Sequence, residues 1–171
     1  KGILKQTESS ISVISVGNLK MGGTGKTPHV AYLLDLLAPK NTSVISRGYK
    51  RATKGLIEGS KTDSATTLGD EPLELLLRQT VSSFKMIVDS NRRNALNYLK
   101  LNYPTTDIAI LDDGYQHRYV NRDANILLSE FNNPFFHDKI FPAGNLRERK
   151  QEAKRADIII FTKCPSSITP A

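Results

Sequence analysis

Apolar runs rich in Ile and Val recur along the chain, separated by segments with helical spacing. The runs cover residues 11–16, 42–46, 84–88, 107–114, 124–130 and 156–162. Continuous apolar runs, rather than strict alternation, are typical of strands that are buried on both faces of a parallel sheet. The sequence therefore predicts six strands in a mostly parallel sheet.

Three segments between these strands have helical patterns. After Pro28 the apolar positions are Val30, Leu33, Leu34 and Leu37, and Pro39 ends the pattern. A second helix is predicted to open at the acidic segment 69–72, and a third covers residues 91–101, with Ser90 or Asn91 as its N-cap. Helices that alternate with strands indicate an α/β fold, a doubly wound sheet with helices on both faces.

Two stretches have no such periodicity. Residues 1–10 are polar and are expected to be a frayed lead-in. Residues 52–69 are rich in Gly, Ser, Thr and Lys, so we expect a long, mobile loop there, of the kind that is usually functional or disordered.

The loop after the first strand carries glycines at 17, 22, 23 and 25 and ends in Lys26 and Thr27. A loop that wraps a polyphosphate with its backbone N–H groups needs small residues, and the helix that follows presents its positive end to the anion. Lys26 is expected to reach the β- and γ-phosphates, and the Thr27 hydroxyl to hold Mg²⁺. This stretch predicts a nucleotide site of the P-loop NTPase kind.

The match departs from the phosphate-loop consensus at two positions. The consensus places its first glycine where this chain has Lys20. Some P-loop ATPases carry a second lysine just before the paired glycines, and Met21 occupies that position here. The alternative interpretation, an ordinary glycine-rich turn with an incidental lysine, is disfavoured by the flanking strand and helix.

The bulk composition bounds the class of protein. With 171 residues, 39% hydrophobic and 24% charged, the chain is expected to form one globular domain over residues 1–171. No apolar run reaches the roughly 18 residues of a membrane span. Cys164 is the only cysteine, which excludes an internal disulfide. The net charge of +7 without aromatic–basic stretches favours a polyphosphate or an anionic lipid over nucleic acid as partner.

Acidic residues follow two of the predicted elements. Asp112 and Asp113 end a strand, where a carboxylate can hold Mg²⁺ beside a phosphate loop, although a solvated acidic turn is the alternative. Two adjacent carboxylates at a strand end are expected to point in different directions, and which one binds metal stays open. Asp70 and Glu71 open a helix. They either interact favourably with the positive end of the helix dipole or supply a general base.

His117 and several arginines complete the candidate set. His117 and Arg118 follow the acidic strand end closely enough to reach a phosphate-transfer site. Gly114, directly after the two aspartates, permits a sharp turn of the chain as it leaves the strand. A lone histidine is more often structural than catalytic. Guanidinium groups at loops and helix starts suit phosphate clamping, although most surface arginines are simply solvated; those in such positions are Arg47, Arg92, Arg147 and Arg149.

Taken together, seven motifs resemble the tetraacyldisaccharide 4′-kinase family of Gram-negative bacteria. In order they are VGNLKMGGTGKTP, SRGYKR, LGDEP, DDGYQHR, RDANILL, FPAGNLRE and KRADIIIFTK, spanning about residues 13–165. The resemblance implies Mg²⁺-dependent transfer of the γ-phosphate of ATP to the 4′-hydroxyl of a tetraacyl glucosamine disaccharide 1-phosphate, which forms lipid IVA in lipid A biosynthesis. It also implies peripheral contact with the cytoplasmic face of the inner membrane, and no nucleic acid partner.

The resemblance assigns roles residue by residue. The ATP cradle is Gly22, Gly23, Thr24, Gly25, Lys26 and Thr27, and the expected metal ligands are Thr27, Asp112 and Asp113. Asp70 resembles the general base, and the other catalytic positions are Lys26, His117 and Arg92. Arg47, Arg147 and Glu148 match positions that line the substrate cleft.

The resemblance also implies a longer protein, with a membrane-associating N-terminal helix and a second, smaller α/β region towards the C-terminus. We therefore expect this chain to be the ATP-binding core, to be soluble, and to bind nucleotide weakly with little kinase activity by itself. Two rival functions remain: a dimeric nucleotide-switch ATPase of the partition or metallo-chaperone kind, and a basic nucleic-acid-binding ATPase. Met21, where such switches need a lysine, argues against the first, and the lack of aromatic stacking platforms argues against the second.

Overall fold

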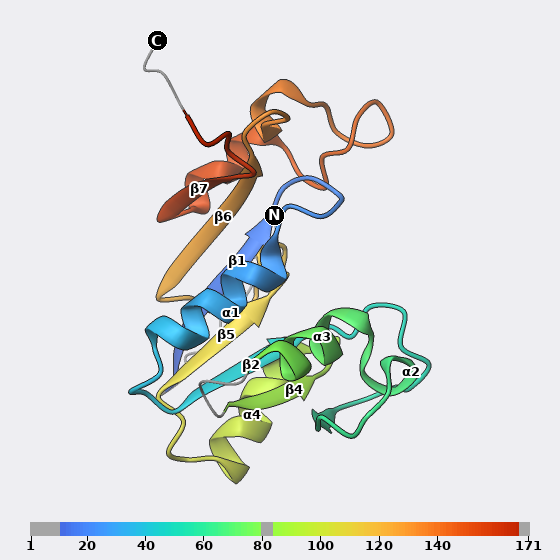
Figure 1. The fold of residues 1–171 in the computed structure, drawn as a ribbon, viewed down its shortest axis with the longest axis vertical. Coiled ribbons are helices and arrows are strands. Elements are labelled where there is room, and N and C mark those ends of the chain that lie inside the picture. Colours follow the sequence, from blue (N-terminus) through green and yellow to red (C-terminus); the bar gives the residue numbers. More distant parts are fainter. Residues whose placement is uncertain (1–10, 80–83, 168–171) are drawn as a thin grey trace.

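A computed structural model of the protein describes residues 11–79 and 84–167, which fold around one seven-stranded sheet (Figure 1). The strands are β1 (Ser12–Asn18), β2 (Thr42–Ser46), β3 (Ile57–Gly59), β4 (Lys85–Val88), β5 (Ile108–Asp112), β6 (Ala124–Glu130) and β7 (Ile158–Thr162). Their order across the sheet is β3-β4-β2-β5-β1-β6-β7, and only the β3–β4 pairing is antiparallel. The six predicted strands are confirmed. The expectation for residues 1–10 lies outside the described residues.

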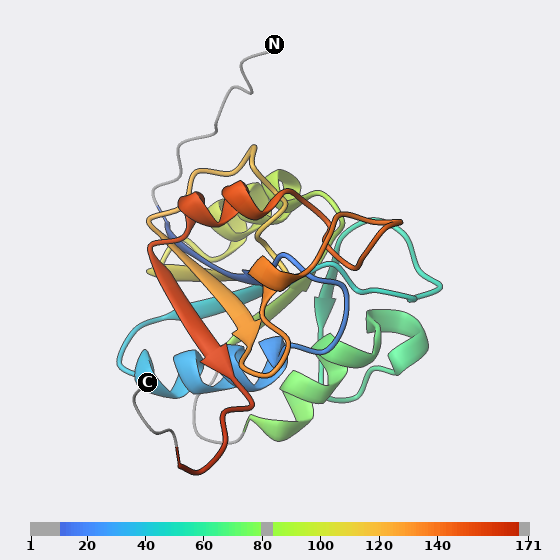
Figure 2. The same ribbon diagram turned by 90° about the horizontal axis from the view of Figure 1, so that it is seen from above.

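Helices cover both faces of this sheet, which confirms the doubly wound α/β class. They are α1 (Lys26–Leu36), α2 (Ala65–Leu68), α3 (Asp70–Arg78), α4 (Arg92–Asn102) and two 3₁₀ segments, η1 (Phe135–His137) and η2 (Lys150–Arg155). Figure 2 shows α1 and α3 on one side of the sheet and α4 with η2 on the other. Among the described residues no helix combines the length and the apolar character that crossing a bilayer requires.

The core explains why the strand runs are continuously apolar. Successive residues of a strand face opposite sides, and here both sides are covered. Toward α1 and α3 the buried residues include Val44, Val88 and Ile110, and toward α4 they include Ile45, Ile87 and Leu111. The apolar side predicted for α1 is also confirmed, since Val30 and Leu34 are buried while Leu33 and Leu37 pack against the same cluster.

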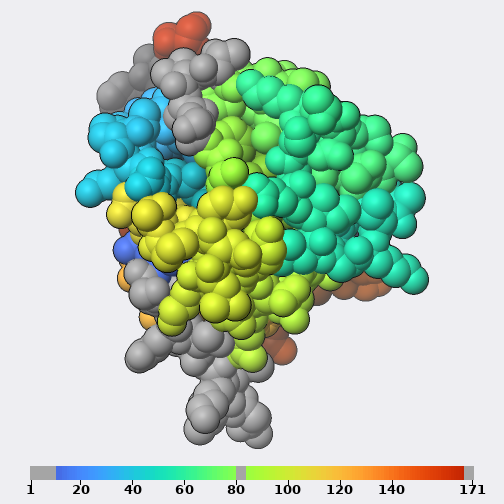
Figure 3. All heavy atoms as spheres, turned by 90° about the horizontal axis from the view of Figure 1, so that it is seen from below, coloured from blue at the N-terminus to red at the C-terminus, as the bar shows by residue number. Residues whose placement is uncertain are grey.

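The prediction of a long, mobile loop over residues 52–69 is wrong in part, because the segment holds two short elements, and its mobility stays a prediction. This segment contains β3 and α2, and Figure 3 shows it in a continuous surface with α4. The carboxylate of Glu58 in β3 accepts hydrogen bonds from the hydroxyls of Tyr98 (3.1 Å) and Tyr103 (2.6 Å) and pairs with Lys85 at 3.2 Å. These partners are far away in sequence, and a three-residue, half-buried strand shows no periodicity of its own.

The topology gathers the polar loops at one edge of the sheet. Strand β1 lies between β5 and β6 with all three parallel, so their carboxyl ends point the same way. In this register Val16 pairs with Asp112. The glycine-rich loop, the acidic strand end and the segment after β6 therefore lie side by side at the edge where doubly wound sheets bind their ligands (Figure 1).

Candidate functional site

The glycine-rich loop joins β1 directly to α1. Gly22 and Gly25 have positive φ angles of 117° and 85°, and Gly25 is the N-cap of the helix. Because Gly25 turns the chain straight into the helix, α1 begins at Lys26, two residues before the predicted start at Pro28. The Asn18 side-chain amide braces the loop from the end of β1, donating to the Thr24 hydroxyl at 2.8 Å. This leaves an open backbone turn at a helix N-terminus, the geometry that binds phosphate.

The Lys26 ammonium points across to the neighbouring strand. Its side chain is buried (7% exposed), and Nζ lies 3.7 Å from an Asp113 carboxylate oxygen. The other Asp113 oxygen accepts a 2.7 Å hydrogen bond from Arg147. Burial acts to raise the pKa of Asp113, but the charges of Lys26 and Arg147 outweigh it and hold the pKa below its ordinary value. The structure thus brings together three residues that the sequence placed in different motifs.

Asp112 has a different environment. It is buried (4% exposed), and its Oδ2 accepts a hydrogen bond from the Ser46 hydroxyl at 3.1 Å. Burial, together with the negative charges of Glu71 and Asp113, raises the pKa of Asp112 to about 6. The Oδ1 atoms of both aspartates are buried without a hydrogen-bond partner among the described residues. A buried carboxylate oxygen without a donor is stabilised by any cation that reaches it.

These atoms fit a magnesium ion that is shared with a phosphate. No group of three or more His, Cys, Asp and Glu side chains among the described residues could hold a metal by itself. Mg²⁺ does not need such a cage, because it usually binds one or two carboxylates together with substrate phosphates and water. Asp112 and Asp113 supply oxygens, and Thr27 lies in the first turn of α1.

The acidic start of α3 faces the same region. Asp70 and Glu71 form its first turn, and both are exposed. The charge of Glu71 helps to raise the pKa of Asp112, so the field of this helix start reaches the strand acids. The role of Asp70 as general base stays a prediction.

His117 and two predicted arginines lie around the acidic strand end. His117 Nδ1 is 2.9 Å from the Tyr119 hydroxyl. Burial, followed by the charges of Arg92 and Arg47, lowers the pKa of His117 to about 4, so the imidazole is neutral at pH 7. Arg47 is exposed.

Arg92, which the sequence analysis grouped with the catalytic residues, is completely buried. Its guanidinium donates to the carbonyls of Asp89 and Asp112, the latter at 3.3 Å. Burial lowers its pKa despite the opposing charge of Asp112. In this chain Arg92 therefore holds the backbone of the acidic strand end, and a catalytic role stays a prediction.

The two predicted residues of the FPAGNLRE motif have different partners. Arg147 bonds Asp113 and lies 3.4 Å from the Gln116 side-chain oxygen. Glu148 forms an ion pair with Arg155. Arg147 thus lies at the acidic strand end, while Glu148 is held by the following 3₁₀ segment, and the role of each in substrate binding stays a prediction.

Lys20 has a role that could not be predicted from its motif. Its side chain is buried, and the ammonium lies 2.8 Å from Asp138 Oδ2 and 2.5 Å from the Asn133 side-chain oxygen. Hydrogen bonds, of which the one from Lys20 has the largest effect, lower the pKa of Asp138 to about 2. The signal in the sequence was the lysine in a position where the consensus has glycine. It ties the phosphate loop to the segment after β6.

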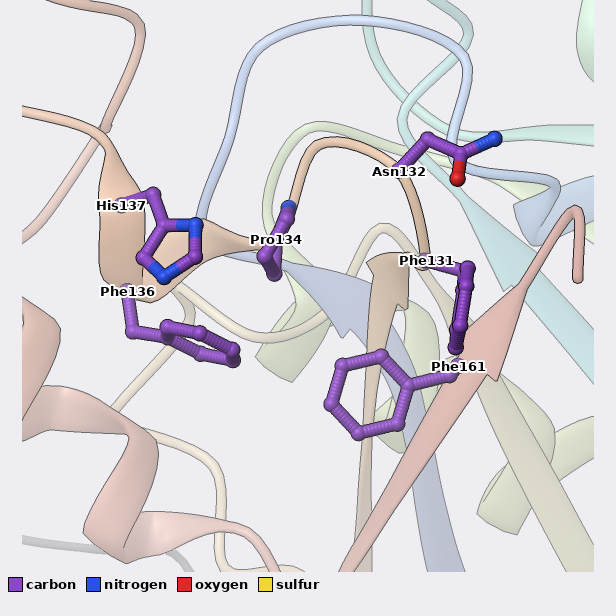
Figure 4. Close-up of a pocket in the computed structure, with 6 residues that line it drawn as sticks. All are labelled: Phe131, Asn132, Pro134, Phe136, His137 and Phe161. Carbon is purple, nitrogen blue, oxygen red and sulfur yellow. The ribbon is translucent and has the colours of Figure 1, made fainter. Parts of the chain in front are cut away.

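An aromatic hollow adjoins this tether. It has a volume of about 340 Å³ and is lined by Phe131, Asn132, Pro134, Phe136, His137 and Phe161 (Figure 4). The residue between two of these, Asn133, is the one that binds Lys20. An apolar surface therefore borders the phosphate loop at the ends of β6 and β7.

Comparisons with known proteins identify the family of the chain. The family model described as "Tetraacyldisaccharide-1-P 4'-kinase" (LpxK) matches residues 1–171. A tetraacyldisaccharide 4'-kinase of Porphyromonas gingivalis strain W83 is 42% identical over 99% of this chain and 48% of its own length, and one of Flavobacterium psychrophilum is 45% identical over 98% and 49%.

A solved structure agrees as well. The crystal structure of "apo" form LpxK from Aquifex aeolicus in complex with ATP has a TM-score of 0.84 and 40% identity, covering 94% of this chain and 50% of that one. The chain spans about half the length of the curated relatives that it matches. With every one of its residues matched by the family model, the chain belongs to the tetraacyldisaccharide-1-P 4'-kinase family.

Proposed function

We propose that this protein binds ATP with Mg²⁺ at the glycine-rich loop and takes part in transfer of the γ-phosphate to the 4′-hydroxyl of a tetraacyl disaccharide 1-phosphate, forming lipid IVA. The observation that carries the proposal is the 3.7 Å approach of Lys26 Nζ to Asp113, with the unpartnered Asp112 carboxylate oxygen beside it. Membership of the family and the ATP in the Aquifex aeolicus structure support the choice of nucleotide and reaction. The acceptor lies in the membrane, so the protein works at its cytoplasmic face.

The residues of the site have separate tasks in this reaction. The loop backbone holds the phosphates, and Lys26 gives its ammonium to the oxygens that gain negative charge. We assign the cation to Asp112 in preference to Asp113, because Asp113 already forms ion pairs with Lys26 and Arg147, whereas Asp112 forms none with the described residues. A bound Mg²⁺ would supply charge neutralisation there.

The acceptor hydroxyl needs a base and a docking surface. Asp70 at the start of α3 is the proposed base, because an exposed carboxylate can accept a proton from a hydroxyl in the cleft. Arg47 and Arg147 supply guanidinium groups for the acceptor, and neutral His117 can offer a hydrogen bond but no charge. Arg92 holds the Asp112 carbonyl in place.

The test has two readouts. Binding of a fluorescent ATP analogue to the 171-residue chain should require Lys26, so Lys26→Ala should weaken it by about tenfold or more. Transfer of labelled phosphate from ATP to a tetraacyl disaccharide 1-phosphate, measured with the full-length protein, should be lost with Lys26→Ala and strongly reduced with Asp70→Asn. Arg78→Gln, at the exposed end of α3, is the matched control. Transfer that survives Lys26→Ala would refute the proposal, and transfer that survives Asp70→Asn would remove the assigned base.

A further inference from the structure

The loop of residues 139–145, here called the tip loop, presents two large apolar side chains to solvent. Phe141 is 64% exposed and Ile140 is 42% exposed. Exposed apolar area of this kind is unfavourable in water and marks a contact surface when it is concentrated and held in place. The tip loop meets both conditions.

The tip loop is held by Asp138 at its base. Asp138 Oδ1 accepts hydrogen bonds from the backbone N–H groups of Lys139 (2.8 Å) and Asn145 (3.2 Å). Across the loop, Leu146 N–H donates to the Lys139 carbonyl at 2.9 Å, and Phe141 N–H donates to the Leu146 carbonyl at 3.0 Å. These bonds fix the backbone, so the two apolar side chains do not fold back onto the core.

Gly144 makes this closure possible. A Cβ at this position would collide with Asp138 Oδ1 and with the backbone of Lys139. The exposure of the two apolar residues is therefore built into the loop by its glycine and by its carboxylate base.

The segment that carries the apolar pair is cationic. Both acids of the segment 138–150 are neutralised, Asp138 by Lys20 and Glu148 by Arg155. The exposed cations Lys139, Arg149 and Lys150 have no carboxylate partner in the parts of the chain that the structure describes. The Lys150 ammonium also donates to the Phe136 carbonyl at 2.6 Å, so Lys139 and Arg149 are the cations of this segment whose side chains have no partner among the described residues. An exposed apolar pair in a cationic segment fits the boundary between the acyl chains and the headgroups of an anionic bilayer.

The tip loop is joined closely to the phosphate site. Met21 N–H of the glycine-rich loop donates to the Asn145 carbonyl at 2.8 Å, and Arg147 N–H donates to the Leu19 carbonyl at 2.7 Å. Arg147 in turn bonds Asp113. A membrane contact made by the tip loop would therefore hold the phosphate site at the level of the lipid headgroups.

We propose that the tip loop inserts Ile140 and Phe141 into the headgroup–acyl boundary of an anionic membrane, with Lys139 and Arg149 against the lipid phosphates. The inference rests on the proposed function for its purpose, since it places the site beside a lipid acceptor. It names a surface of the kinase core itself as a membrane contact.

The absence of tryptophan from the 171-residue chain gives a direct test. Phe141→Trp introduces a single reporter at the tip, and Leu101→Trp introduces one at a side chain that is 80% exposed at the end of α4. Each variant is mixed with vesicles of equal parts phosphatidylethanolamine and phosphatidylglycerol, with or without brominated acyl chains, and with vesicles of phosphatidylcholine alone. No nucleotide or acceptor is present, so failure here leaves the proposed kinase reaction untouched.

We expect the emission of Phe141→Trp to shift to the blue and to be quenched by the brominated chains on anionic vesicles, and that of Leu101→Trp to stay unchanged. Phe141→Asp should weaken sedimentation with these vesicles by roughly tenfold. Three results would overturn the inference: no vesicle binding, equal quenching at both reporters, or an emission from position 141 that is already blue-shifted without vesicles, since the protein itself would then cover the tip.

Discussion

Replacing Asp112 by asparagine should stabilise the metal-free protein while weakening its function. The carboxylate is buried, has one hydrogen bond from Ser46, and leaves Oδ1 without a partner among the described residues. Burial and the charges of Glu71 and Asp113 raise its pKa from 3.8 to about 6. Such a group is less stable as an anion in the folded protein than in the unfolded chain, and asparagine removes the charge at almost constant volume.

The pKa shift sets the size and the pH range of the effect. Because the folded-state pKa is the higher one, the folded protein binds more protons between pH 3.8 and 6, and its stability falls as pH rises through this window. A shift of this size corresponds to roughly 3 kcal/mol above pH 6. The new amide must bury an N–H without a ready acceptor, which offsets about 1–2 kcal/mol. The net gain at pH 7 is therefore about 1–2 kcal/mol; it disappears at about pH 5, and near pH 4 the cost of the buried amide makes the variant the less stable protein.

Urea unfolding with a chelator present, at a series of pH values, measures this gain. Asp70→Asn is the matched control, because it removes an exposed carboxylate from the same edge of the sheet and should change stability little. Binding of a magnesium–nucleotide complex should be weaker for Asp112→Asn than for the wild type. A stabilising change that costs function is expected where a charged group is retained for its chemistry.

The reasoning fails if Asp112→Asn is less stable than the wild type at pH 7. It also fails if the difference between the two proteins does not grow between pH 4 and pH 6. Either result would mean that the ionised carboxylate has partners that offset its burial.

Three further predictions concern neighbouring residues. Lys20→Gly, which introduces the consensus glycine, should lower the melting temperature by a few degrees, because Asp138 loses its ammonium partner. An unchanged melting temperature in a thermal unfolding experiment would show that the Lys20–Asp138 pair does not stabilise the fold. The imidazole of His117 should titrate near pH 4 in NMR spectra, below the ordinary 6.5, and a midpoint at 6.5 would show that it is not buried as described. Glu71→Gln should lower the pKa of Asp112, since it removes a nearby negative charge, and the pH-dependent fall in stability should then end at a lower pH. An unchanged pH dependence would mean that the charge of Glu71 does not act on Asp112.

The sheet could be predicted because its signal is local. The apolar runs of β2 and β6 are complete in the sequence, and the strand faces need no knowledge of their partners. Strand β3 could not be predicted in this way, because Glu58 is fixed by Tyr98 and Tyr103, which lie 40 and 45 positions away. A short edge strand depends on such distant partners, and its sequence has no hydrophobic periodicity from which it could be predicted.

The features of the site also divide into those with a local sequence signal and those that depend on contacts between distant segments. The glycine pattern with Lys26 is a local motif, so the phosphate loop was predicted from spacing. The bonds from Asn18 to Thr24, from Ser46 to Asp112 and from Lys20 to Asp138 each depend on how segments pack. Ordinary polar residues at such positions carry no signal until the fold brings them together.

The contrast between Asp112 and Asp113 shows how the fold separates two neighbouring identical side chains. Asp113 has a positive φ of 50°, and at Gly114 a Cβ would lie 2.6 Å from the Leu111 Cβ and 2.7 Å from Ser15 Oγ. The sharp turn that this glycine permits points Asp113 toward Lys26 and leaves Asp112 buried against Ser46. The expected divergence of the two carboxylates is confirmed, and the two pKa shifts differ accordingly. Asp113 is paired with Lys26 and Arg147, which hold its pKa down. For Asp112, burial and the charges of Glu71 and Asp113 outweigh the Ser46 hydroxyl and the weaker effect of Lys26, so its pKa rises. A larger residue at 114 would collide with β5 and β1 at this turn, and it would therefore disturb the placement of both carboxylates.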